Sequence, residues 1–87
     1  MVSVKTTVIN PMGLHLRPAQ VFIKAIAPFA SEVDITANGR TVNAKSIMNL
    51  MAACIKQGTE IEIQCSGPDE QEALDAALRA IASGLGE

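Results

Sequence analysis

The single histidine of the chain, His15, lies in the segment Gly13-Leu14-His15-Leu16-Arg17-Pro18-Ala19. A neutral imidazole is a nitrogen nucleophile near physiological pH. Arg17, two residues later, carries a planar guanidinium that suits the oxygens of a phosphoryl group. A nucleophilic ring beside such a cation predicts a residue that accepts and holds a phosphoryl group.

The residues on either side of His15 place it at the start of a helix. Residues 3–8 alternate like a strand, and the turn-forming segment 10–13 follows. Pro18 lacks a backbone N–H and is tolerated only in the first turn of a helix, so the helix must begin near Leu16. Apolar residues then recur at helical spacing: Ala19, Phe22, Ile23 and Ile26.

The N-terminus of a helix offers unpaired N–H groups and a partial positive charge, both of which attract anions. The same charge disfavours a protonated ring, so we expect His15 to be neutral with one ring nitrogen free to attack. The plainer interpretation is a solvated residue that happens to begin a helix. The isolated His-x-Arg pattern favours that interpretation, whereas the whole seven-residue segment favours a function.

This segment and a second one, Asn43-Ala44-Lys45-Ser46-Ile47-Met48, together resemble the HPr family. Its members are histidine-containing phosphocarriers of the bacterial phosphoenolpyruvate-dependent sugar phosphotransferase system. The resemblance extends over essentially the whole chain. It implies that His15 accepts a phosphoryl group on Nδ1 from enzyme I and passes it to sugar-specific enzyme IIA domains, with Arg17 assisting.

The resemblance also implies that Ser46 is a regulatory phosphorylation site. Its partners would then be an ATP-dependent kinase or phosphorylase and a catabolite-control transcription factor. Taken from the residues alone, Ser46 is first an N-cap for a helix beginning at Ile47. A phosphate at a helix N-terminus is electrostatically acceptable, so both roles are possible for one residue.

A helix is expected from Ile47 to an end near Gly58. Its residues 47–54 are apolar nearly all round, which predicts either a helix buried on both sides or one with an exposed patch. If Leu50 with Ala53 or Cys54 faces inward, the opposite face points to solvent. We expect this second arrangement. We also expect His15 and the start of the helix after Ser46 to lie near one another, because both helices would begin at the same sheet edge. The predicted partner-binding residues are Leu16, Gln20, Lys24, Ile47, Met48 and Met51.

The charges are segregated along the chain although the net charge is only −2. Up to Gly58 six cations face two carboxylates, whereas from Thr59 seven carboxylates face one cation. His15 therefore lies in the positive part, which would steer a phosphoryl group and an acidic partner toward it. An acidic, solvated C-terminal helix is the plainer explanation of the second part.

The remaining patterns predict an α+β fold. Val33, Ile35 and Ala37 alternate up to Asn38-Gly39, which predicts a type I′ hairpin with Ile35 opposite Val42. A strand over 59–66 and a helix that starts with a capping box at Asp69 and Glu72 complete the order βαββαβα. We expect a four-stranded antiparallel sheet with three helices on one face, an open-faced β-sandwich.

Composition limits the function classes. The 87 residues predict one HPr-like domain, 1–87, with an aliphatic core, no membrane insertion and no nucleic-acid partner. Cys54 and Cys65 lack metal-ligand spacing and are expected in or near the core, in a reducing cytoplasm. We expect a monomeric phosphocarrier without metal or cofactor rather than an autonomous enzyme.

Two other functions are consistent with the residues. One is a mainly regulatory protein, a coactivator of catabolite repression or a component of a nitrogen-type branch, although a purely regulatory protein has no need of a nucleophile. The other is a ligand-binding or metal-binding α/β module in which His15 only begins a helix. Acid-labile phosphate formed with phosphoenolpyruvate and enzyme I would separate them.

Overall fold

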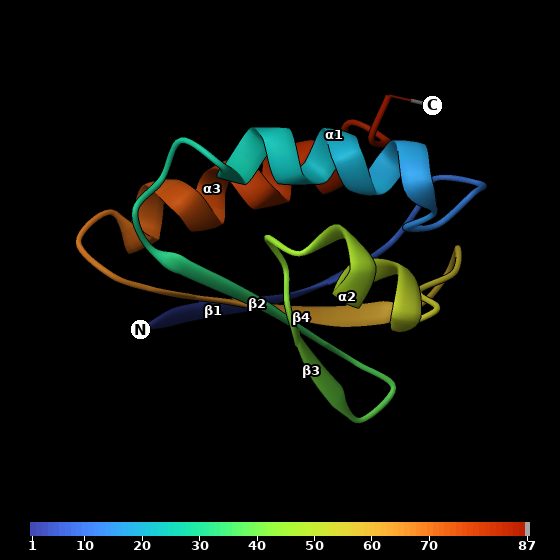
Figure 1. Cartoon of the computed structure of the whole chain (residues 1–87), viewed down its shortest axis with the longest axis horizontal. Helices are drawn as coiled ribbons and strands as arrows, with labels where there is room; N and C mark the ends of the chain where they lie inside the picture. The colour runs from blue at the N-terminus through green and yellow to red at the C-terminus, as the bar shows by residue number, and fades with distance from the viewer. Residues whose placement is uncertain (87) are drawn as a thin grey trace.

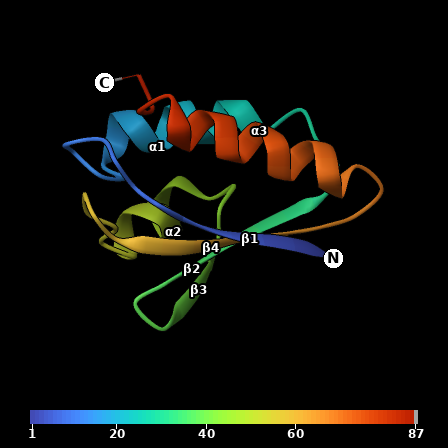
Figure 2. The same cartoon turned by 180° about the vertical axis from the view of Figure 1, so that it is seen from behind.

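The computed structural model describes residues 1–86, which form a four-stranded antiparallel sheet and three helices. In chain order the elements are β1 (Val2–Thr7), α1 (Leu16–Ile26), β2 (Glu32–Ala37), β3 (Arg40–Asn43), α2 (Ile47–Ala52), β4 (Glu60–Ser66) and α3 (Glu70–Ala82). The strand order is β1-β4-β2-β3, and the helices lie on one face of the sheet (Figures 1 and 2). The predicted open-faced sandwich and its element order are confirmed.

The sheet register agrees with the alternation of apolar and polar residues. Ile35 of β2 lies opposite Val42 of β3 and opposite Ile63 of β4, so the three apolar side chains share the face that the helices cover. Asn38 and Gly39 have φ angles of 53° and 78°, the two positive values that a type I′ turn requires. The predicted hairpin and its register are confirmed.

The core between sheet and helices is mainly aliphatic. Its one fully buried aromatic residue within residues 1–86 is Phe22, on the inner face of α1. The other large side chains that are fully buried are Val8, Pro18, Ile26, Val33, Ile35, Leu50, Ile55, Ile61, Ile63, Ile81 and Leu85. This burial supplies the hydrophobic stabilisation that holds the three helices and the sheet together.

Helix α2 is shorter than the pattern over residues 47–54 suggests. It ends with Ala53 as its C-cap, and Cys54 adopts a left-handed conformation with φ of 54°. Leu50 and Ala53 face the core, but the Cys54 side chain is exposed, so its predicted place in the core is wrong. Cys65 is fully buried as predicted, and burial raises the pKa of its thiol.

Helix α3 begins where predicted, but the capping box with Glu72 is not the contact that Asp69 makes. Its carboxylate accepts hydrogen bonds from the N–H groups of Ala30 and Ser31, both at 2.9 Å, and from the Ser31 hydroxyl. Glu70 accepts the N–H of Gly67 at 3.3 Å. Asp69 thus links the segment after α1 to the start of α3. Because its carboxylate makes this tertiary contact, it makes no capping hydrogen bond to α3.

Candidate phosphorylation site

His15 is the N-cap residue of α1, and its side chain is exposed to solvent. Its backbone carbonyl accepts the N–H of Ala19 at 2.9 Å, the first hydrogen bond of the helix. The N–H groups of Leu16 and Arg17 lie in the first turn, where no helix carbonyl is available to accept them, and Pro18 has no N–H. An exposed imidazole therefore stands beside backbone donors and the positive end of α1.

The loop before His15 is shaped by a close approach between two backbones. Leu14 donates its N–H to the carbonyl of Ile55 at 2.9 Å. Gly13 has a φ of 63°, and a Cβ at this position would lie 2.4 Å from the Ile55 carbonyl oxygen. The Asn10 side chain donates to the Gly13 carbonyl at 2.7 Å. Only glycine fits this position, so Gly13 fixes where His15 leaves the loop.

Two hollows flank the imidazole. The first, which we call the His15 hollow, has a volume of about 180 Å³ and is lined by Leu14, His15, Met51, Cys54, Ile55 and Lys56. The second is lined by Met12, His15, Leu16, Arg17, Pro18 and Met51. Met12 and Leu16 are each 52% exposed, so the ring is surrounded by apolar side chains that another protein is able to cover.

Cys54 and Lys56 line the His15 hollow although the sequence did not single them out as site residues. They reach His15 because Leu14 bonds to Ile55, a contact between residues 41 positions apart. Periodicity along the chain carries no signal for such a contact. Gly13 was detectable as part of a turn, but its steric role depends on the same approach.

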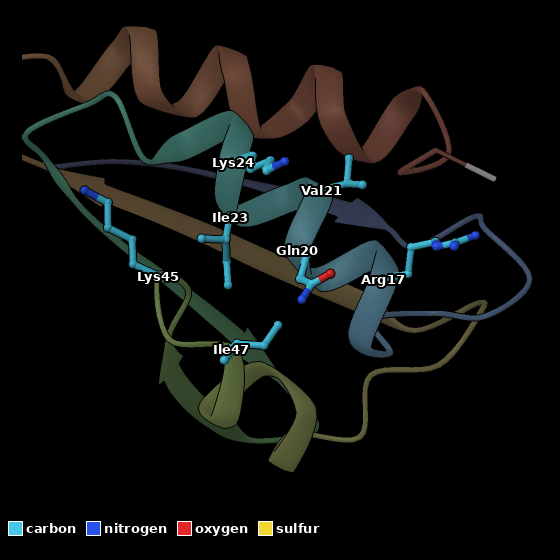
Figure 3. Close-up of a pocket in the computed structure, with 7 residues that line it drawn as sticks. All are labelled: Arg17, Gln20, Val21, Ile23, Lys24, Lys45 and Ile47. Atoms are coloured by element: carbon cyan, nitrogen blue, oxygen red, sulfur yellow. The ribbon is translucent and has the colours of Figure 1, made fainter.

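The predicted partner residues on α1 and α2 share one face. One groove, which we call the α1–α2 groove, is lined by Arg17, Gln20, Val21, Ile23, Lys24, Lys45 and Ile47. In Figure 3 Gln20 and Ile23 of α1 point toward Ile47, whereas Arg17, Val21 and Lys24 point away from it. Met48 and Met51 are 78% and 42% exposed, as the outward patch requires. Ile47 is only half-exposed because it packs against the core, so its predicted outward position is partly wrong.

The expectation that α1 and α2 begin at the same sheet edge is wrong. Lys45, just before α2, donates its ammonium N–H to the carbonyl of Phe29, which follows the end of α1, at 2.7 Å. The Leu14–Ile55 bond joins the opposite ends. The two helices therefore run in opposite directions, because the hairpin of β2 and β3 returns the chain to the far end of α1. His15 lies beside the Met51 end of α2, and Ser46 begins the other end.

Ser46 caps α2 as the sequence predicts. Its hydroxyl oxygen accepts the N–H of Asn49 at 3.3 Å. Lys45 and Ile47, its two neighbours in the chain, both line the α1–α2 groove. A charge placed on Ser46 would therefore lie at the edge of the face that carries the predicted partner residues.

This face is positively charged. The described residues that line the α1–α2 groove and the two hollows beside His15 include four cations, Arg17, Lys24, Lys45 and Lys56, and no carboxylate. Acidic residues instead dominate β4 and α3. The fold thus turns the charge asymmetry of the sequence into one cationic face around the imidazole.

Comparison with known proteins decides the family. Residues 2–83 match the family model described as the PTS HPr component phosphorylation site. The chain belongs to the HPr family. It is 44% identical over 82 residues to the phosphocarrier protein HPr of Cupriavidus necator, covering 94% of this chain and 92% of that protein.

Two further relatives of this HPr-family chain bear on its structure and role. HPr-C-His from Thermoanaerobacter tengcongensis superposes with a TM-score of 0.95 at 37% identity, covering 100% of this chain and 98% of that one. The HPr-like protein Crh of Bacillus subtilis is 44% identical over 75 residues, 86% of this chain and 88% of Crh. The chain is therefore a phosphocarrier of the HPr type, and one of its relatives is Crh.

Two other properties concern the part of the chain that the structure describes. None of its helices combines the length and the apolar composition needed to cross a membrane. Within residues 1–86, no three side chains of the types His, Cys, Asp and Glu gather in a way that holds a metal ion.

Proposed function

We propose that His15 is the phosphoryl acceptor of this HPr-family chain, taking the group from enzyme I and passing it to enzyme IIA domains. The observation that carries the proposal is the exposed imidazole at the N-terminus of α1, set between two hollows that a partner is able to fill. A donor must bring its phosphorus atom within bonding distance of the ring. An imidazole inside the core would prevent this.

The transfer is a simple exchange of one bond to phosphorus. The lone pair of the unprotonated ring nitrogen of His15 forms the new N–P bond while the bond to enzyme I breaks, and its electron pair stays with enzyme I. In the second transfer a nucleophile of an enzyme IIA domain forms the new bond to phosphorus. The N–P bond breaks, and its electron pair returns to the ring nitrogen of His15. Catalysis of such a step is mainly positioning and charge stabilisation.

Arg17 and the first amides of α1 supply this charge stabilisation. Both come from the first turn of α1, immediately beside the ring, and Arg17 lines the hollow on one side of it. The guanidinium donates to phosphoryl oxygens in pairs, and the amides at the helix end add their partial positive charge. Arg17 thereby assists His15 without itself being covalently modified.

The partner surface comprises the apolar and cationic side chains around the ring. An acidic partner with an apolar centre fits this face, since Leu16, Met48 and Met51 expose apolar surface and Lys24 adds charge. Gln20 and Ile47 lie between them across the α1–α2 groove. Met side chains repack easily, which suits a face that meets enzyme I and several IIA domains in turn.

Ser46 is proposed as a regulatory phosphorylation site on the edge of this surface, for a kinase or phosphorylase that recognises the start of α2. A phosphate would add roughly 1.5 to 2 negative charges there and repel an acidic donor. A mainly regulatory role, including docking to a catabolite-control transcription factor, is the second candidate. The similarity to Crh favours it, whereas the accessible His15 favours the carrier role.

A two-step relay tests the proposal. The chain is incubated with phosphoenolpyruvate and enzyme I, the phosphorylated product is purified, and an enzyme IIA is then added. The carrier role predicts acid-labile label on this chain that moves to the IIA, and loss of both steps in His15→Ala. A chain that is labelled only by a kinase, on an acid-stable serine, would support the regulatory role and contradict the carrier role.

A further inference from the structure

A second cation besides Arg17 lies beside the imidazole. Lys56 lines the His15 hollow, whereas Arg17 lines the other hollow next to the ring. His15 and Met51 line both hollows, so they form the wall between them. Each hollow therefore holds one cation, and the two cations come from different segments of the chain.

The segment that carries Lys56, between α2 and β4, is bonded to the loop before α1. Gly58 donates its N–H to the carbonyl of Val8 at 2.8 Å, and Leu14 donates to Ile55 at 2.9 Å. In both views of the fold the two segments lie at the same end of the molecule (Figures 1 and 2). These bonds lie on either side of Lys56 and fix its place in the chain against the loop.

The backbone of Lys56 itself is also held. Its N–H donates to the hydroxyl of Thr59 at 3.2 Å, and its carbonyl accepts the N–H of Thr59 at 3.1 Å. Its Cα lies so close to Gly13 that a Cβ on that glycine would come within 2.8 Å. The side chain, in contrast, is exposed and forms no ion pair with a carboxylate among residues 1–86.

The His15 hollow has room for a phosphoryl group. Its volume is about 180 Å³, whereas one water molecule needs about 10–15 Å³ of free volume. Leu14 and Ile55 give it two buried apolar walls, and none of the described residues that line it is a carboxylate. An ammonium has three N–H donors on a long, flexible stem, so Lys56 is able to bond phosphoryl oxygens there.

We propose that Lys56 is a second catalytic cation, whose ammonium donates hydrogen bonds to the phosphoryl group as it reaches and leaves His15. This inference rests on the proposed function and names a further residue of the same site. The exchange of bonds at phosphorus is the one described above, and Lys56 stays protonated throughout. Because negative charge spreads over three oxygens during the transfer, cations from two hollows stabilise more of it than Arg17 alone.

A titration of the phosphorylated chain tests the contact without any partner. The chain is phosphorylated with phosphoramidate, a small chemical donor, and the phosphate on His15 is followed by ³¹P NMR as the pH changes. A nearby ammonium favours the dianion, so Lys56→Gln should raise the pKa of the phosphate by about half a pH unit. Lys24→Gln removes a cation that lines neither hollow and should change this pKa much less. Equal values in wild type and Lys56→Gln, or equal shifts in the two variants, would overturn the proposal.

Rates with enzyme I show whether the contact contributes to transfer. At high salt, where long-range attraction is screened, Lys56→Gln should be phosphorylated about tenfold more slowly, the loss of one charge-assisted hydrogen bond. Lys56→Arg keeps a cation and should recover most of the rate. Arg40→Gln, a cation lost from β3, should keep the wild-type rate. A wild-type rate in Lys56→Gln, or no recovery in a folded Lys56→Arg, would refute the catalytic role.

The two tests separate this inference from the carrier role. Phosphoramidate needs no enzyme I, so a chain that takes phosphate from it but not from enzyme I would contradict the carrier role and leave the titration to decide on Lys56. A wild-type chain that enzyme I phosphorylates, with no change in Lys56→Gln, would refute the role of Lys56 alone.

Discussion

His15 is able to act because one glycine lets the loop before it touch another backbone. At Gly13 a side chain would meet the Ile55 carbonyl and the Lys56 Cα at 2.4 and 2.8 Å, and the φ of 63° is unfavourable for other residues. The ring itself makes no capping hydrogen bond to the described part of α1. Its position therefore depends on the loop rather than on bonds of its own.

Gly13→Ala tests this dependence. The left-handed conformation costs about 1–2 kcal/mol for alanine, and displacement of the Ile55 segment adds to it. Gly39→Ala is the matched control, since its φ is 78° but nothing lies within 4 Å of the added Cβ. Urea unfolding should show a larger loss of stability for Gly13→Ala, together with slower phosphorylation. Equal losses in the two variants would argue against the close approach.

Ser46→Asp tests the proposed regulatory site by adding one negative charge. Asp is as good an N-cap as Ser, so α2 should stay folded while the partner surface gains a negative charge. We expect phosphorylation by enzyme I to slow about tenfold, or ~1.4 kcal/mol. Ser46→Asn, an uncharged cap of similar quality, should remain close to wild type. Unchanged kinetics in Ser46→Asp would contradict the proposed regulation.

At the scale of the elements, Asp69 joins the end of α1 to the start of α3. The Ser31 hydroxyl and then the N–H of Ala30 hold the pKa of the Asp69 carboxyl below its usual range. A group with a lowered pKa in the folded state stabilises it above its unfolded pKa, about 3.9 for Asp. This contribution is lost as the pH falls through the lower, folded-state pKa.

Asp69→Asn should therefore lower the melting temperature at pH 7, and its difference from wild type should shrink at pH 2, as the wild-type carboxyl becomes protonated. Asp75→Asn, on the exposed face of α3, is the control at pH 7, because Asn keeps an oxygen to accept the bond from Gln71. Thermal unfolding by circular dichroism at both pH values gives the comparison. A difference between Asp69→Asn and wild type that persists undiminished at pH 2 would rule out the ionised contact.

The two cysteines report on the end of α2 and on the sheet. Cys54 is exposed after the helix, whereas Cys65 on β4 is fully buried and burial raises the pKa of its thiol. Thiolates are the reactive form, so a thiol reagent at pH 8 should modify Cys54 in the folded protein and Cys65 only after unfolding. Cys54→Ser should remove the fast reaction. Two equally fast thiols would contradict this placement.

Local patterns predicted much of these elements. Pro18 marked the start of α1, and Asn38-Gly39 with the pair Ile35 and Val42 gave the hairpin and its register. The end of α2 was missed because Cys54, a non-glycine residue, adopts a positive φ. The direction of α2 relative to α1 was also missed, since it depends on the Lys45–Phe29 and Leu14–Ile55 contacts between distant residues.

At the scale of the whole molecule, the fold gathers cations on the face of His15 and places most acidic residues on β4 and α3. The first fifty-eight residues supply α1 and α2, and the acidic remainder supplies the central strand β4 and the helix α3. This separation was visible in the sequence. The gathering of the cations around one imidazole was not visible in the sequence, because it requires α2 to lie beside α1.

Such a charge distribution should govern the encounter with enzyme I. We expect the second-order rate of phosphorylation to fall about tenfold between low and high salt, as screening removes the attraction over distances beyond about 10 Å. Stopped-flow or quench-flow measurements at several salt concentrations check this. A rate independent of salt would show that the cationic face does not steer the partner.

The central claim is that His15 carries the phosphoryl group, and the most direct measurement is to map it. The chain is incubated with phosphoenolpyruvate and enzyme I, digested at neutral to alkaline pH, and its peptides are sequenced by mass spectrometry. The account predicts one acid-labile phosphate on the ring of His15, absent from His15→Ala. Phosphate on any other residue, or an unmodified His15 when enzyme I itself is charged, would contradict it.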